Sequence, residues 1–108
     1  MIGVYEISQQ VKITPEMYIG TPSITNLFMF LDGYEAAKVE LGIEPSETDI
    51  EFHQKFEPWL QQKFQVQTIN CWAKIIKSHA DDEKEAFDYF FQLLDEFLEN
   101  KSKFHGNK

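Results

Sequence analysis

Residues 82–100 read DEKEAFDYFFQLLDEFLEN and give the clearest indication of the fold. Apolar side chains recur in this stretch at i, i+3, i+4, i+7, i+10 and i+11, the spacing of one face of a helix. The residues on that face are Phe87, Phe90, Phe91, Leu94, Phe97 and Leu98. Asp81 or Asp82 can cap the first turn, and Glu85 follows near the position of a capping box. The stretch therefore predicts an amphipathic helix that packs its phenylalanines into a core.

Residues 21–42 predict a second helix by the same spacing. Pro22 suits the first helical position, where its missing N–H costs nothing, and Gly42 is a natural stop. Apolar residues occur almost all round this helix, which indicates a central place in the fold. Gly33 lies in its middle, where glycine costs about 1 kcal/mol relative to alanine. We explain this glycine by the close approach of residues 17–20 or of another helix.

Two further helices are predicted in the middle of the chain. The first covers residues 46–64, and Pro58 inside it predicts a kink or two short helices that meet at Glu57. The second covers residues 68–80, with a threonine as its cap and two lysines near its end, as the helix dipole prefers. Four segments of the chain thus carry the helical period.

The two ends of the chain give weaker patterns. Residues 1–14 fit either a short helix or an edge strand, and Pro15 ends whatever precedes it. We expect residues 17–20 to form a loop and the polar residues 101–108 to form a frayed tail. The sequence therefore predicts an all-α protein with a single domain over residues 1–108, built as a bundle of four to five helices.

Composition limits the classes of function. The chain has 108 residues, of which 43% are hydrophobic and 15% aromatic, so it can bury a core and is not disordered. Its net charge of −8 opposes binding to nucleic acid or to an anionic membrane surface. The single cysteine, Cys71, cannot form an internal disulfide, and no signal-peptide pattern or membrane-spanning apolar run occurs. We therefore expect a cytoplasmic protein.

Catalytic motifs are absent from the sequence. His53, His79 and His105 lack the spacing of a metal site, and no nucleotide-binding loop or nucleophile elbow occurs. His53 and Glu57 could share a helix face, but two ligands do not make a metal site. We predict that the protein is not an enzyme and uses no metal or other cofactor.

The acidic side of the helix over residues 82–100 is the leading candidate for a binding surface. Like charges one turn apart destabilise a helix, so such a one-sided concentration suggests a use. A surface of one sign also steers an oppositely charged partner and accelerates association. We predict a docking surface for a basic protein; the alternative is a solvated helix face. The candidate residues are Asp81, Asp82, Glu85, Asp88, Asp95 and Glu99.

Two other hypotheses use different parts of the chain. A small-ligand binder or an enzyme would have a partly apolar pocket beneath the loop at residues 17–20. The residues of that pocket would be Tyr18, Asp32, Tyr34 and Trp72. A homodimer would instead bury surplus aromatic side chains, since ten Phe, four Tyr and two Trp are many for one small core.

A succession of short motifs along almost the whole chain is similar to a family of small bacterial proteins of unknown function. The motifs are P-x-M-Y-I-G at 15–20, F-L-D-G-Y at 30–34, F-x-x-W-L at 56–60, C-W-A-K-I-I at 71–76 and F-F-x-L-L-D-E-F at 90–97. Relatives carry Arg-Pro-Gly where this chain has Thr14, Pro15 and Glu16, and glycine in place of Cys71. The resemblance implies a helical single domain.

Small acidic bacterial proteins of this type include many toxin-neutralising immunity proteins, so the resemblance suggests an immunity-like function by analogy. Such a protein would be a non-enzymatic inhibitor that offers its acidic face to a basic partner, for example a nuclease toxin. It would act by occlusion, with charge contributing to rate and specificity more than to affinity.

Overall fold

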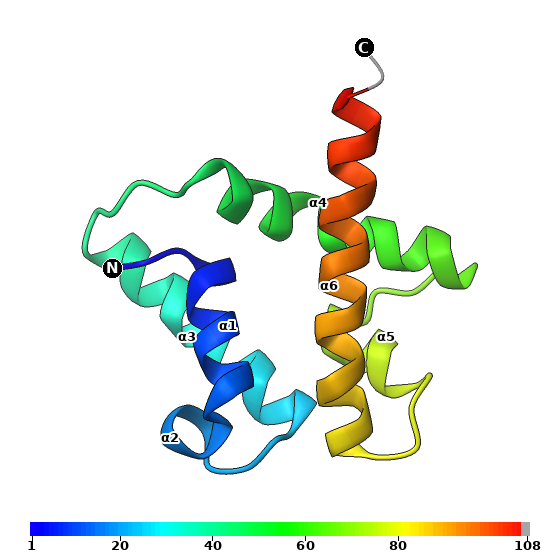
Figure 1. The fold of residues 1–108 in the computed structure, drawn as a ribbon, viewed down its shortest axis with the longest axis horizontal. Coiled ribbons are helices and arrows are strands. Elements are labelled where there is room, and N and C mark those ends of the chain that lie inside the picture. Colours follow the sequence, from blue (N-terminus) through cyan, green and yellow to red (C-terminus); the bar gives the residue numbers. More distant parts are fainter. Residues whose placement is uncertain (107–108) are drawn as a thin grey trace.

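The computed structural model describes residues 1–106, and the side chains of residues 1–100. This part of the chain forms six helices and no strand, which confirms the predicted all-α fold (Figure 1). The helices are α1 (Val4–Ile13), α2 (Pro15–Ile19), α3 (Ile24–Glu40), α4 (Glu47–Phe64), α5 (Trp72–Lys77) and α6 (Glu83–Gly106). Within the same residues, no helix is both long and apolar enough to cross a lipid bilayer.

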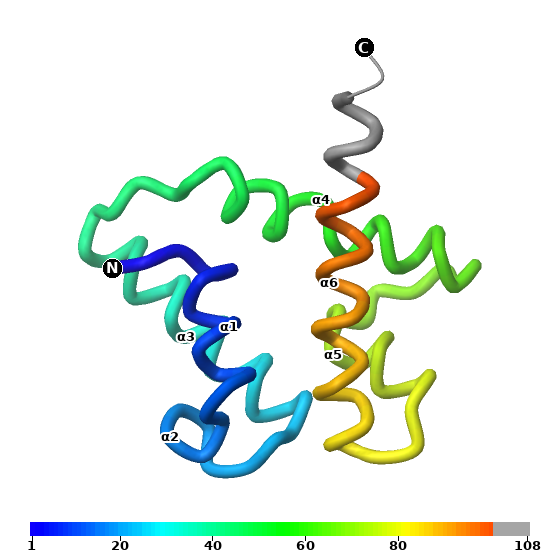
Figure 2. Tube along the Cα trace, in the orientation of Figure 1, coloured from blue at the N-terminus to red at the C-terminus, as the bar shows by residue number. Residues whose placement is uncertain are grey.

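Helices α1, α2 and α3 contact one another on one side of α6 (Figure 1). Helix α4 starts on that side, passes behind α6 in this view and contacts α5 on the other side. Helix α6 contacts α3, α4 and α5, while α1 reaches across to α4. The N-terminal residues lie beside the last turns of α3 (Figure 2). Helices α3 and α4 and the start of α1 thus border the region of the candidate site.

Helix α6 buries the face that the sequence predicts. Five of its six predicted core residues are buried and Leu98 is half-buried. Asp82 Oδ1 accepts a hydrogen bond from Glu85 N at 2.8 Å, and Glu85 Oε1 accepts one from Asp81 N at 3.3 Å. The predicted cap is therefore present. Residues 101–106, predicted from the sequence as part of a frayed tail, instead continue α6 to Gly106. Residues 107 and 108 lie outside the described residues.

An aromatic cluster joins α4, α5 and α6. Phe56 and Phe90 have no exposed surface, and their ring centroids lie 5.8 Å apart in an edge-to-face arrangement. Phe97 packs against Phe56 at 5.4 Å, and Trp72 packs against Phe90 at 4.8 Å. Such aromatic pairs contribute about 0.5–1.5 kcal/mol each beyond the burial of their area. This cluster fixes α4 relative to α6.

The N-terminal region resolves one open alternative and corrects one expectation. Residues 1–14, which fitted helix or strand, contain the helix α1, whose Val4, Ile7 and Val11 are buried. Residues 17–20 are not a loop: Pro15 begins α2, and that helix continues to Ile19. Proline ends one helix here and also starts the next, because its missing N–H needs no partner at a first helical position.

Three predictions about the other helices are also wrong, one of them only in part. The added Cβ of an alanine at position 33 would meet no atom within 4 Å, so no close approach explains Gly33. Helix α4 continues through the exposed Pro58 as one helix, so the two short helices that were one option there do not form, and the alternative of a kink stays a prediction. Helix α5 begins at Trp72 rather than near residue 68, and the Ile69 side chain is fully exposed. Helix α3 contacts four other helices, but Met29 on its outer side is 67% exposed, so it is not enclosed.

Candidate functional site

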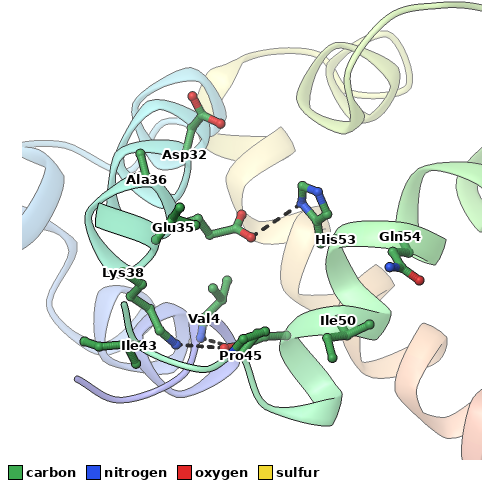
Figure 3. A pocket seen from close by; sticks show the side chains of 12 residues that line it. Val4, Asp32, Glu35, Ala36, Lys38, Ile43, Pro45, Ile50, His53 and Gln54 are labelled. Carbon is green, nitrogen blue, oxygen red and sulfur yellow. Dashed lines mark hydrogen bonds and ion pairs between the residues drawn. The ribbon is translucent and has the colours of Figure 1, made fainter. Parts of the chain in front are cut away.

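A groove of about 440 Å³ lies between α3, the first half of α4 and the turn that joins them (Figure 3). We call it the α3–α4 groove. Its apolar lining residues are Val4, Ala36, Val39, Ile43, Pro45 and Ile50. Its polar lining residues are Asp32, Glu35, Lys38, Asp49, His53 and Gln54. The rim is open, since Val39 is 78% and Ile50 is 40% exposed.

An ion pair forms the floor of the groove. Lys38 Nζ lies 2.8 Å from Asp49 Oδ2, and the two side chains are only 8% and 5% exposed. Val4 N donates to Asp49 Oδ1 at 2.8 Å, and Ser46 N donates to Asp49 Oδ2 at 3.4 Å. Burial alone would raise the pKa of Asp49, but these hydrogen bonds and the Lys38 charge outweigh it and lower that pKa. The pair therefore ties α1, α3 and α4 together.

Local sequence explains how Asp49 reaches this position. Ser46 caps α4 by accepting a hydrogen bond from Asp49 N at 3.1 Å, and the Asp49 carboxylate bonds back to Ser46 N. This reciprocal capping box fixes the first turn of α4. On α3, Lys38 lies on the same face as the buried Leu27 and Leu31, so its ammonium group points into the protein toward that carboxylate.

Glu35 and His53 face each other across the groove from α3 and α4 (Figure 3). Glu35 Oε2 lies 3.6 Å from His53 Nδ1, and the two side chains are 28% and 74% exposed. Burial raises the pKa of Glu35; the charge of His53 opposes that rise, and the carboxylates of Asp49 and Asp32 add to it. A half-buried carboxylate of this kind favours a positive or hydrogen-bond-donating neighbour.

The charge that the groove can offer to a ligand is negative. Lys38 is the one lysine among the twelve lining residues, and its charge is balanced by Asp49. Asp32 and Glu35 remain, and His53 lies opposite Glu35. The groove can therefore hold an apolar side chain between its walls while its carboxylates bind a positive group. It suits an anion poorly.

Tyr34 has a structural contact that the sequence hypothesis did not foresee. Its hydroxyl donates a hydrogen bond to Ile2 O at 2.6 Å, and Lys38 Nζ lies 3.5 Å from the same oxygen. Burial raises the pKa of Tyr34. Tyr34 thus ties the N-terminal segment to α3 and helps to place Val4 in the floor of the groove.

The structure does not gather the four residues of the predicted small-ligand pocket. The Tyr18 hydroxyl donates to Gln10 Oε1 at 2.9 Å, while Trp72 is only 6% exposed, inside the aromatic cluster. Tyr34 binds the N-terminal backbone. Asp32 alone among the four lines the α3–α4 groove. The four residues therefore do not form a pocket beneath residues 17–20. The groove that Asp32 lines lies between α3 and α4.

The six acidic residues predicted as a docking surface are all exposed, along α6 and just before it. Asp81 and Asp82 directly precede α6, and Glu85 lies in its first turn. The capping hydrogen bonds use the carboxylates of Asp82 and Glu85 but only the backbone N–H of Asp81. The side chains of Asp82 and Glu85 therefore have a structural role.

The other three acids continue along α6. Asp88 pairs with Lys84 at 2.9 Å, and this contact raises the pKa of Lys84. Asp95 and Glu99 form no ion pair within the part of the chain whose side chains are described. They leave this side of α6 negative and open to solvent.

Sequence reasoning missed most of the groove. The lysine on the buried face of α3 was the available signal, because a buried ammonium group needs an acidic partner. His53 was noted, but with Glu57 as its neighbour; the structure pairs it with Glu35, and Glu57 instead accepts a hydrogen bond from Trp72 N at 3.3 Å. Among the described residues, no group of three or more ligating side chains could hold a metal ion.

Comparisons with known proteins add no assignment. No protein-family model matches the chain, and neither a curated protein nor a solved structure matches it significantly.

Proposed function

We propose that this protein is a non-enzymatic module that binds a basic partner protein, and that the partner docks in the α3–α4 groove. The observation that most supports the proposal is the groove itself. Half of its lining residues are apolar, its floor charges neutralise each other, and its remaining carboxylates favour a positive group. The carboxylates of the groove that have no lysine partner thus suit the recognition of a positively charged group.

The charge of the whole molecule supports a basic partner. The net charge of −8 creates a negative field that accelerates the approach of a positive protein at low salt. The exposed acids of α6 contribute to this field in the proposal, although they lie outside the groove. Steering of this kind raises the association rate more than the affinity.

Small-ligand binding is the alternative, and Asp32 is the one residue of the predicted ligand pocket that lines this groove. Pockets for small molecules bury most of the surface of their ligand. The exposed Val39 and Ile50 leave the rim of this groove open. Exposed apolar residues around a hollow are typical of protein-interaction sites, so the geometry favours a protein segment.

We also propose an immunity-like role, which rests on the family resemblance alone. In that role the protein would occlude the active surface of a basic toxin. A cytoplasmic location, expected from the lone cysteine, is also part of the proposal.

Retention of partners by three immobilised forms of the protein tests the proposal. Wild-type protein, Ala36→Arg and Met29→Arg are each exposed to lysate of the native cell at low salt, and bound proteins are eluted with rising salt and identified by mass spectrometry. Both substitutions add one positive charge at an exposed position of α3, but only Ala36 lines the groove.

We expect one basic protein to be retained by wild type and Met29→Arg and to be lost by Ala36→Arg. Retention of the same protein by all three forms would place its binding site elsewhere. Retention of acidic proteins, or of nothing above background, would contradict a module for a basic partner.

A further inference from the structure

We infer that the segment bound in the α3–α4 groove is a basic amphipathic helix, with apolar side chains that enter the groove and a lysine or arginine that reaches Asp32 and Glu35. This inference rests on the proposed function and specifies the partner of that same site.

The walls of the groove favour a helix over an extended segment. Both walls are helices, and residues 1–106 contain no strand edge to which an extended chain could add. An extended segment would therefore lose water from its backbone N–H and C=O groups without gaining partners for them. A helix satisfies those groups internally and presents side chains alone.

The shape of the α3 wall also suits a helix. Ala36 lines the groove with a single methyl group, so little side-chain volume at this position keeps another helix away from α3. Val39 and Ile50 stand exposed on opposite walls of the groove. Apolar side chains spaced i, i+3 and i+4 on a docked helix would project between them.

Charge decides which kind of helix fits. Asp32 and Glu35 lie one turn apart on α3, and Glu35 is half-buried with a raised pKa. A positive side chain beside it would favour its charged form. A second copy of this chain is the less suitable occupant, because it carries the same net charge of −8.

Three synthetic peptides of about fifteen residues, a length at which a helix can begin to form, test the inference. The first has leucine at helical spacing and lysine at its other positions. The second is identical except that two central lysines are replaced by proline, which prevents a continuous helix. The third has glutamate in place of lysine. Each is titrated by fluorescence anisotropy into wild type, Ala36→Arg and Met29→Arg, and n-octylamine is used as a competitor.

We expect the first peptide to bind wild type and Met29→Arg at least about tenfold more tightly than it binds Ala36→Arg. We expect it also to bind wild type at least about tenfold more tightly than either other peptide does. Equal binding by the proline peptide, still weakened by Ala36→Arg, would overturn the helix but keep the proposed function.

Other results separate the remaining possibilities. Displacement by n-octylamine at concentrations comparable to those of the peptide would overturn the inference in favour of a small-amine site. Equal binding of the acidic peptide would overturn the charge argument. Binding that Ala36→Arg does not weaken, or no binding of either lysine peptide, would overturn both the inference and the groove as the docking site.

Discussion

Lys38 and Asp49 form the contact on which the groove most depends. Removing the lysine leaves the Asp49 carboxylate without its charged partner, and the Asp49 side chain is only 5% exposed. Breaking one side of a buried ion pair typically costs about 3–5 kcal/mol. We expect Lys38→Met to lower the free energy of unfolding by about 3 kcal/mol, measured by urea denaturation monitored by circular dichroism.

Lys55→Met is the matched control for this substitution. Lys55 pairs with Glu51 at 3.6 Å on the surface of α4 and is 63% exposed. Exposed pairs of this kind contribute less than about 1 kcal/mol. Losses of similar size in the two variants would show that the floor pair has no special role in stability.

Glu83 makes stability depend on pH. It accepts hydrogen bonds from Ser23 Oγ at 2.6 Å and Thr25 N at 2.9 Å, and it pairs with Lys77 at 2.9 Å. Burial alone would raise its pKa, but these contacts outweigh burial and lower the pKa from 4.5 to about 2. The folded state therefore favours the ionised carboxylate of Glu83. This stabilisation is complete only at pH values above the pKa that the group has in the unfolded chain.

We expect wild-type protein to lose this stabilisation as pH falls from about 5 toward 2. The Glu83→Gln variant should start less stable at neutral pH and show a smaller decline over the same range, followed by urea midpoints at several pH values. Glu99→Gln, at an exposed position of α6, should decline like wild type. If the stability of Glu83→Gln fell as far as that of wild type over this pH range, the attribution of the loss to Glu83 would be contradicted.

At the scale of helices, glycines test the account of α3. Position 33 has open space and lies inside a helix, so Gly33→Ala should raise the free energy of unfolding by about 0.5–1 kcal/mol. Gly42 follows α3 with a φ of +69°, where Gly42→Ala should cost about 1 kcal/mol. Both values can be measured by urea denaturation. A loss at position 33 would restore the close approach predicted from sequence.

The long helices could be predicted because their core faces repeat over several turns. In α6, six apolar positions recur at helical spacing, and an acidic cap precedes them. The short helices α2 and α5 have five and six residues, too few for a period to decide. Ile69 shows why: it fits the apolar spacing of α5, yet it precedes that helix and its side chain is fully exposed.

The groove could not be predicted because it is a property of the whole molecule. Its walls come from α3 and α4, and part of its floor comes from Val4 at the start of the chain. The contact that assembles them, Val4 N to Asp49, joins residues 45 positions apart. The sequence shows a lysine on an apolar helix face, but the position of its partner depends on the turn between the helices. Only Asp32 among the predicted site residues lines the groove.

Whole-molecule charge gives a kinetic prediction. A variant with Asp81→Asn, Asp88→Asn, Asp95→Asn and Glu99→Gln keeps every groove residue. We expect the lysine-rich helical peptide to associate with it several-fold more slowly at low salt, with little change in dissociation rate, because charge outside the docking site acts on approach. Stopped-flow fluorescence measures both rates. An unchanged association rate would reduce the α6 acids to a solvated helix face.

The most direct test of the groove as the docking site is to locate the bound peptide. A nitroxide label at the centre of the lysine-rich helical peptide broadens the amide signals of nearby protein residues in a two-dimensional NMR spectrum. We predict the strongest broadening at Ala36, Ile43, Ile50 and His53, which line the groove. Broadening centred instead on Asp88, Asp95 and Glu99 of α6 would contradict the account and make the acidic helix face the docking site.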